Sequence, residues 1–230
     1  MSSVNKNKLV LFDVDHTLMV DNGAHWIAYM DAFKKVYDVK LPKEFPPWHG
    51  YTDLQIIYSL MDMYKLPRDE SKALEIVHAI VESFLMQNLS GSKLLVGVEE
   101  VLIELKNHHD VIIGLVTGNI EAVAYAKLRH LRIDEYFILG GFGGTSAIRY
   151  ELVLDAMKKA EDRFGKIDKS NVFVVGDTSG DIAAARGAGS KVVSVCTGFE
   201  SMEILKSKNP DYILEDLSDT KKFIEVIQNG

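Results

Sequence analysis

From Leu94 onward, short apolar runs alternate with helical patterns, and this alternation constrains the fold more than any other feature of the chain. Three nearly continuous runs are rich in β-branched residues and lie within DVIIGLVTGN, NVFVVGDTSGD and KVVSVCTG. A weaker fourth run is PDYILED (210–216). Strands of this kind are typical of a parallel sheet that helices cover on both faces. We therefore predict an α/β fold built on such a sheet.

The segment from about 20 to 92 has a different pattern. Apolar residues recur at helical spacing in three stretches, which breaks at LPKEFPPWHG and Leu66-Pro67 separate. No convincing strand interrupts them, and the turn-rich NLSGSK (88–93) would return the chain to the sheet. We predict an inserted helical domain at 20–92 and a core domain formed by 1–19 and 93–230.

Polar residues follow the predicted strands at the edge where ligands collect in such sheets. In VLFDVDHTLMV, Asp13 and Asp15 come directly after an apolar run. A carboxylate beside a core costs several kcal/mol unless it is paired or bound to a metal. Thr117, Asp177 and Asp181 follow two other strands. These five residues predict a shared site at the carboxyl edge of the sheet.

Composition narrows the function classes. The 230 residues carry a formal net charge of −7 and 47% of them are hydrophobic, which argues against a broad nucleic-acid or anionic-membrane surface. No apolar stretch approaches the ~20 residues of a membrane span, and the single cysteine is compatible with a reducing compartment. We expect a cytoplasmic protein whose partner is a small molecule, and leave its oligomeric state open.

The motifs resemble those of the haloacid dehalogenase-like hydrolases. Asp13-Val14-Asp15-His16-Thr17 resembles their first motif, DxDxT, while LVTGN and GDTSGD resemble the second and the fourth. The motifs occur in the family's order across almost the whole chain. The resemblance implies a Rossmann-like core with an inserted all-helical cap.

The resemblance also implies the chemistry. Asp13 would be the nucleophile that forms an aspartyl-phosphate, and Asp15 would be the general acid and then the base. Mg²⁺ is the implied cofactor because it prefers oxygen ligands and shares its shell with phosphate. Its implied site comprises Asp13, Asp15 (through its backbone carbonyl), Asp177 and Asp181, the last acting through water or by orienting the basic residue.

Phosphate binding is the implied role of Thr117, Gly118 and Asn119. The third motif is weaker, because the family usually supplies a lysine there, often followed by proline. Here Arg149 opens a helix without a following proline, and Lys158 or Lys159 is the runner-up. We predict that Arg149 binds the phosphoryl group, since a guanidinium can do so in a bidentate manner.

In the cap, His49 and Tyr51 are candidates for substrate contact. They lie in PPWHGYTD, where related phosphoglycolate phosphatases tend to have GRTD, so the expected arginine is replaced by Tyr51. We assign no function to two other features. The basic run KLRHLR (127–132) is predicted to be the solvated side of a helix, and GGFGG (140–144) a flexible connection.

The sequence thus predicts a Mg²⁺-dependent phosphatase that acts on a small phosphorylated metabolite, of the phosphoglycolate or sugar phosphate class. Two alternatives stay open. A phosphomutase of the β-phosphoglucomutase type would share every motif, and a phospho-ligand-binding protein without turnover would share the fold.

Overall fold

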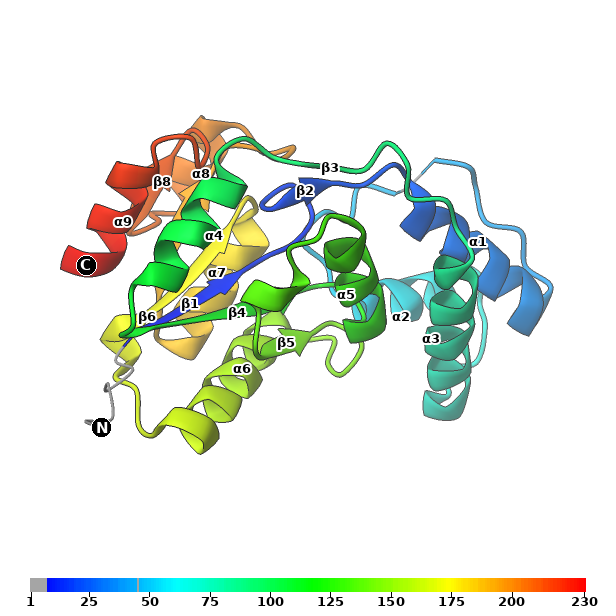
Figure 1. The fold of residues 1–230 in the computed structure, drawn as a ribbon. Helices are drawn as coiled ribbons and strands as arrows, with labels where there is room; N and C mark the ends of the chain where they lie inside the picture. Colours follow the sequence, from blue (N-terminus) through cyan, green and yellow to red (C-terminus); the bar gives the residue numbers. More distant parts are fainter. Residues whose placement is uncertain (1–7, 45) are drawn as a thin grey trace.

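A six-stranded sheet forms the centre of the computed structural model, which describes residues 8–44 and 46–230. The strand order is β5-β4-β1-β6-β7-β8, and all neighbours are parallel (Figure 1). The strands are β1 (Lys8–Phe12), β4 (Val111–Thr117), β5 (Gly140–Phe142), β6 (Val172–Gly176), β7 (Lys191–Val195) and β8 (Tyr212–Leu214). The predicted parallel sheet is confirmed, including the weaker run near residue 212.

Helices cover both faces of this sheet, and β1 shows why. Val10 and Phe12 belong to one hydrophobic cluster, whereas Leu9 and Leu11 belong to another, because successive side chains in a strand point to opposite faces. The first cluster includes residues of α4 (Val98–Asn107), α5 (Glu121–His130) and α9 (Thr220–Asn229). The second includes residues of α6 (Arg149–Phe164), α7 (Ser179–Ala188) and α8 (Met202–Ser207). Two 3₁₀ turns, η1 (Asp134–Tyr136) and η2 (Lys169–Asn171), complete the layers.

The segment between β1 and α4 is helical, as predicted for an inserted cap. Its helices are α1 (Ala24–Tyr37), α2 (Asp53–Met63) and α3 (Glu70–Leu85), and they form a third hydrophobic cluster (Figure 1). Where the chain leaves and re-enters the core, β2 (Met19–Val20) pairs antiparallel with β3 (Lys93–Leu94). The domain boundaries at 19/20 and 92/93 remain predictions.

The glycine-rich stretch 140–144 begins as a strand, so the predicted flexible connection is wrong at residues 140–142. Its first three residues form β5, and they are buried beside β4. The glycines are required by close packing: a Cβ on Gly141 would lie 1.9 Å from the Leu152 carbonyl oxygen, and one on Gly143 equally close to the Gly118 carbonyl oxygen. Glycine here permits tight backbone contact with α6 and with the loop after β4.

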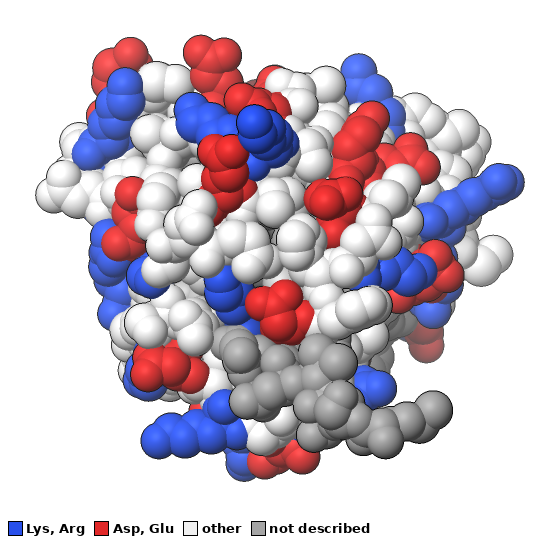
Figure 2. Space-filling view, turned by 60° about the vertical axis from the view of Figure 1, so that its left-hand side comes forward, with Lys and Arg blue, Asp and Glu red and all other residues white. Residues whose placement is uncertain are grey.

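The surface carries both charge signs. On the face shown in Figure 2, acidic and basic side chains are interspersed among uncharged residues. Within 8–44 and 46–230, no helix has both the length and the apolar character that crossing a bilayer requires.

Candidate active site

Three adjacent strands bring the predicted site residues together. β1 lies between β4 and β6 in the sheet, and Asp13, Thr117 and Asp177 stand at or just after the carboxyl ends of these strands. Since parallel strands end at the same edge, residues 160 positions apart in sequence become neighbours. One direct contact shows this: the hydroxyl of Thr17 donates a hydrogen bond of 3.1 Å to Asp177.

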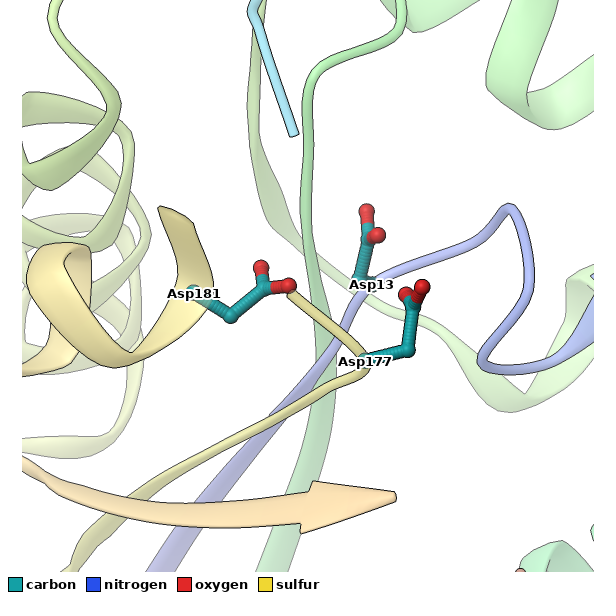
Figure 3. Close-up of side chains that lie close together, drawn as sticks. All are labelled: Asp13, Asp177 and Asp181. Atoms are coloured by element: carbon teal, nitrogen blue, oxygen red, sulfur yellow. The ribbon is translucent and has the colours of Figure 1, made fainter. Parts of the chain in front are cut away.

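Asp13, Asp177 and Asp181 form an acidic cluster, in which one oxygen of each carboxylate lies within 4.8 Å of the others (Figure 3). All three residues are buried. Asp181 lies in the first turn of α7, where it forms a capping box with Thr178. Asp15 is not part of this cluster, because its side chain is directed at other partners.

The electrostatics of this acidic cluster fit a divalent cation. Burial raises the pKa of Asp13 to about 7; Arg149 opposes this rise, and repulsion from Asp181 and Asp15 adds to it. The pKa of Asp177 is raised well above its usual value by burial and by repulsion from Asp181 and Asp13. Buried carboxylates that repel one another are stabilised by a hard cation with oxygen ligands, so the donor set suits Mg²⁺.

Arg149 is a basic residue beside the acidic cluster. Its guanidinium lies 3.2 Å from an oxygen of Asp13 and donates two hydrogen bonds to Asp181, at 2.6 and 3.1 Å. Its third donor binds the carbonyl oxygen of Gly50. Of the two alternatives, Lys158 is exposed, and Lys159 donates to the Gly140 carbonyl and pairs with Asp155. Arg149 is therefore the predicted cation that contacts the acidic cluster.

The loop after β4 presents the second motif. Thr117 is fully buried, and its hydroxyl accepts hydrogen bonds from the backbone N–H and the side-chain amide of Asn119. Gly118 lies against the helical segment, since a Cβ there would approach the Tyr51 carbonyl oxygen to 2.3 Å. All three predicted phosphate-binding residues of this loop therefore lie at the carboxyl end of β4, beside β1.

Lys127 is the residue that sequence reasoning missed, and the prediction of a solvated side for 127–132 is wrong at this position. Its ammonium lies 2.8 Å from both oxygens of Asp15 and 3.1 Å from Asp21, and its side chain is 1% exposed. Asn119 also donates to Asp15. Burial alone would raise the pKa of Asp15, but the charge and hydrogen bonds of Lys127 lower it to about 2.

A sequence signal for Lys127 did exist. The buried residues of α5 are Val123, Ala124, Lys127 and Leu128. Positions 123 and 127 are one helical turn apart, as are 124 and 128, so Lys127 lies on the apolar stripe of its helix. A lysine in such a stripe indicates a buried partner, because an unpaired buried ammonium is very costly.

Asp53 joins the helical segment to the core. After Lys127, it is the second residue whose role the sequence did not reveal. Its carboxylate accepts hydrogen bonds from the Ile120 backbone N–H and from the Tyr29 hydroxyl, and lies 3.3 Å from His25. The backbone N–H of Asp53 donates to the Gly118 carbonyl. The start of α2 is thereby fixed on the loop after β4.

A cavity of about 310 Å³ opens between the strand ends and the helical segment. Asp13, Asp15 and Arg149 line its core side. On the other side, His49 and Tyr51 both line it, as do several further aromatic residues. Both predicted cap contacts therefore face the same cavity as the catalytic candidates.

Comparison with known proteins agrees with this geometry. The family model described as haloacid dehalogenase-like hydrolase matches residues 10–195. The chain belongs to this family. The predicted resemblance to the haloacid dehalogenase-like hydrolases is thereby confirmed.

The relatives are phosphatases and pyrophosphatases by name. A phosphoglycolate phosphatase of Photorhabdus laumondii is 32% identical over 130 residues, which cover 56% of this chain and 54% of the relative. A pyrophosphatase PpaX of Oceanobacillus iheyensis is 24% identical over 218 residues, with 92% and 94% covered. A further relative, from Caldanaerobacter subterraneus, is 32% identical over 58% of this chain and 60% of its own length. The 32% matches thus span less than two thirds of each relative.

Solved structures share the fold. The crystal structure of a predicted phosphatase from Clostridium acetobutylicum is 22% identical, with a TM-score of 0.72 over 95% of this chain and 99% of that chain. At this identity the likeness establishes the fold alone.

Proposed function

We propose that this protein is a Mg²⁺-dependent phosphatase that hydrolyses a small phosphomonoester, of the phosphoglycolate or sugar phosphate class, through an aspartyl-phosphate. The observation that carries the proposal is the acidic cluster of Asp13, Asp177 and Asp181, with Arg149 3.2 Å from Asp13. A nucleophilic carboxylate, a cation site and a guanidinium are then within reach of one phosphoryl group. The names of the relatives support the same reaction class.

Asp13 would attack the phosphorus atom and form an acyl phosphate, while the alcohol leaves. As a nucleophile it must be ionised, although burial raises its pKa to about 7. The charge of Arg149 favours the ionised form, and the guanidinium would also bind phosphoryl oxygens. The Thr117 hydroxyl and the Gly118 backbone N–H would donate to the remaining phosphoryl oxygens. Asn119 would support this loop, since its own donors bind Thr117 and Asp15.

Asp15 would serve as acid and then as base. The base step uses the ionised form, which Lys127 holds by lowering the pKa to about 2. The acid step requires a proton on Asp15, and the negative charge of a bound phosphoryl group favours that form. After the alcohol leaves, Asp15 would take a proton from the water that attacks the aspartyl-phosphate.

Asp13 and Asp177 would hold Mg²⁺ through side-chain oxygens, and Asp15 through its backbone carbonyl. Asp181 would act through Arg149, which it binds by two hydrogen bonds. When bound, the cation would neutralise carboxylate and phosphoryl charge at the reacting centre.

The helical segment at 20–92 would act as a cap. Contacts of Asp53 with Ile120 and Gly118 tie it to the core, and the cavity beneath it would exclude bulk water from the reaction. The partner would be a small phosphorylated metabolite, whose alcohol lies under His49 and Tyr51.

The test is release of inorganic phosphate from small phosphomonoesters, with and without Mg²⁺, by the wild type and Asp13→Asn. We expect Mg²⁺-dependent release that the variant reduces by about 10⁴-fold or more, since loss of a nucleophile removes the covalent route. Circular dichroism of the variant checks that its fold is intact.

The alternatives give different results in the same assay. Conversion of a sugar phosphate into an isomer, without phosphate release, would indicate a phosphomutase. Binding of phosphate analogues without turnover by folded, Mg²⁺-loaded protein would indicate a binding protein. Near-normal activity of Asp13→Asn would remove Asp13 as the nucleophile.

A further inference from the structure

The cation on the leaving-group side of the cavity is already saturated. Lys127 lines this cavity, and its ammonium contacts both Asp15 oxygens, Asp21 and the amide oxygen of Asn119, all within 3.1 Å. An ammonium has only three donors, so these acceptors use all of them. A negative group on the substrate would meet no donor of Lys127 and would face Asp15 and Asp21.

The other basic groups near the cavity do not offset the negative charge of Asp15 and Asp21. Both ring nitrogens of His25 face charged neighbours: Nε2 lies 3.3 Å from Asp53 and Nδ1 lies 3.4 Å from the Lys127 ammonium. Burial lowers the pKa of His49, which disfavours the charged form of its imidazole. Arg149 is directed to the acidic cluster and to Gly50.

Aromatic rings supply much of the remaining wall. Trp26 and Tyr29 of α1, Trp48 of the loop before α2 and Phe199 of the loop after β7 line the cavity. Phe199 stacks with His49 at 3.9 Å between ring centroids, so residues of the core and of the helical segment meet across the opening. Phe199 itself is 63% exposed, so one face of its ring is accessible.

We propose that the alcohol released from the substrate is uncharged and contains a ring, as in a sugar or a nucleoside, and that aromatic side chains of the cavity pack against this ring. This inference rests on the proposed phosphatase function and narrows it. Phosphoglycolate and pyrophosphate are disfavoured, because each carries a second anionic group into a region without a spare cation among the described lining residues. A cavity of about 310 Å³ also exceeds what a two-carbon acid fills.

The first experiment separates charge from size. kcat/KM is measured for 2-phosphoglycolate and 2-hydroxyethyl phosphate, which are of similar size but differ in the charged carboxylate, and for pyrophosphate. We expect 2-hydroxyethyl phosphate to be preferred about tenfold or more, because a carboxylate would be repelled by Asp15 and Asp21. Glucose 6-phosphate and adenosine 5′-monophosphate then test the ring, and the better of them identifies its source. At least one should exceed 2-hydroxyethyl phosphate about tenfold or more, since a ring adds apolar contact.

Two variants test the named residues. Phe199→Ala should lower kcat/KM for the preferred ring ester about two- to tenfold, the range for one aromatic contact, and should lower it less for 2-hydroxyethyl phosphate. Ile204→Ala, which removes an exposed apolar side chain outside the cavity, is the matched control and should change neither. In Asp21→Asn, the ratio of kcat/KM for 2-hydroxyethyl phosphate to that for 2-phosphoglycolate should fall severalfold. An asparagine oxygen can keep the hydrogen bonds that Asp21 accepts from Gly23 and Ala24.

Calorimetric titration of Asp13→Asn with the same esters and Mg²⁺ ranks affinity without turnover. If no ester is hydrolysed but the affinities keep this order, the phosphatase proposal fails, while the preference of the cavity for an uncharged ring stands. If phosphate is released but 2-phosphoglycolate or pyrophosphate ranks first, the phosphatase proposal stands and the inference is overturned. Ring esters that rank no higher than 2-hydroxyethyl phosphate overturn it as well.

Discussion

The two sides of the cavity treat charge in opposite ways. On the core side, Asp13, Asp177 and Asp181 are buried within 4.8 Å of one another, with Arg149 as their nearby counter-charge. On the leaving-group side, Asp15 and Asp21 share the buried ammonium of Lys127. The pKa values follow this contrast, because that of Asp13 rises to about 7 and that of Asp15 falls to about 2.

The difference indicates what each side receives. The core side holds excess negative charge that a divalent cation would neutralise, and Arg149 can turn to a phosphoryl group once that cation is bound. On the leaving-group side, Lys127 is already used by Asp15 and Asp21, so that side would receive a group without negative charge. Carboxylates two residues apart in sequence thus belong to different electrostatic environments.

Arg149→Ala should have the largest effect on this contrast. We expect kcat/KM to fall by about 10²- to 10³-fold, because the phosphoryl group loses a preorganised cation. Arg149→Lys should recover part of the activity, since it keeps the charge near Asp13 and loses the bidentate geometry. Steady-state phosphate release measures both variants.

Lys158→Ala is the matched control, and it should keep near-normal activity because Lys158 is exposed on α6. If Lys158→Ala loses most of its activity while Arg149→Ala stays active, the prediction that Arg149 binds the phosphoryl group is wrong.

Lys127→Met should have the next largest effect, and this effect should appear in the stability of the fold. Removing the ammonium leaves Asp15 and Asp21 without their buried partner, and we expect the free energy of unfolding to fall by about 3 kcal/mol. Urea denaturation measures it. Lys106→Met, which breaks the exposed pair with Glu135, should cost less than about 1 kcal/mol. Equal losses in the two variants would contradict a special role for the buried pair.

Mg²⁺ should stabilise the fold in a pH-dependent way, with a smaller effect. The pKa of Asp13 is about 7 in the fold and 3.8 when unperturbed. Protonation of Asp13 therefore stabilises the metal-free fold fully below pH 3.8, and this contribution disappears as pH rises through 7. Mg²⁺ competes with this proton, so it should bind more strongly at about pH 8 than at about pH 5.

Thermal unfolding measures this effect. At about pH 8, Mg²⁺ at ~100 times its Kd adds ~2.7 kcal/mol, which corresponds to roughly 5–10 °C in Tm for a chain of this size. At about pH 5 the gain should be less than about half as large at the same Mg²⁺ concentration. Asp177→Asn should lose most of the Mg²⁺-induced rise in Tm. Asp62→Asn, which changes an exposed pair with Arg68, should keep this rise. A Mg²⁺ effect that is the same at both pH values would argue against binding at these carboxylates.

Local pattern was sufficient to predict the sheet and the core side of the site. Strands buried on both faces need nearly continuous apolar runs, so their positions could be predicted, and Asp13, Thr117 and Asp177 follow three of them. Parallel strands end at one edge, which brings these residues together whichever helices connect the strands. The prediction was wrong at 140–142, because only the tertiary structure shows that Gly140 and Gly141 belong to a strand buried beside β4.

The sequence by itself therefore determined the fold class, the family motifs and the residues that gather at the strand ends. Only the tertiary structure decided which carboxylate pairs with which cation. Asp15 and Lys127 are separated by 112 positions, and Asp53 and Ile120 by 67. The physical reason is that the local sequence pattern determines which strands are buried and where they end. An ion pair instead depends on which helix face packs against which loop.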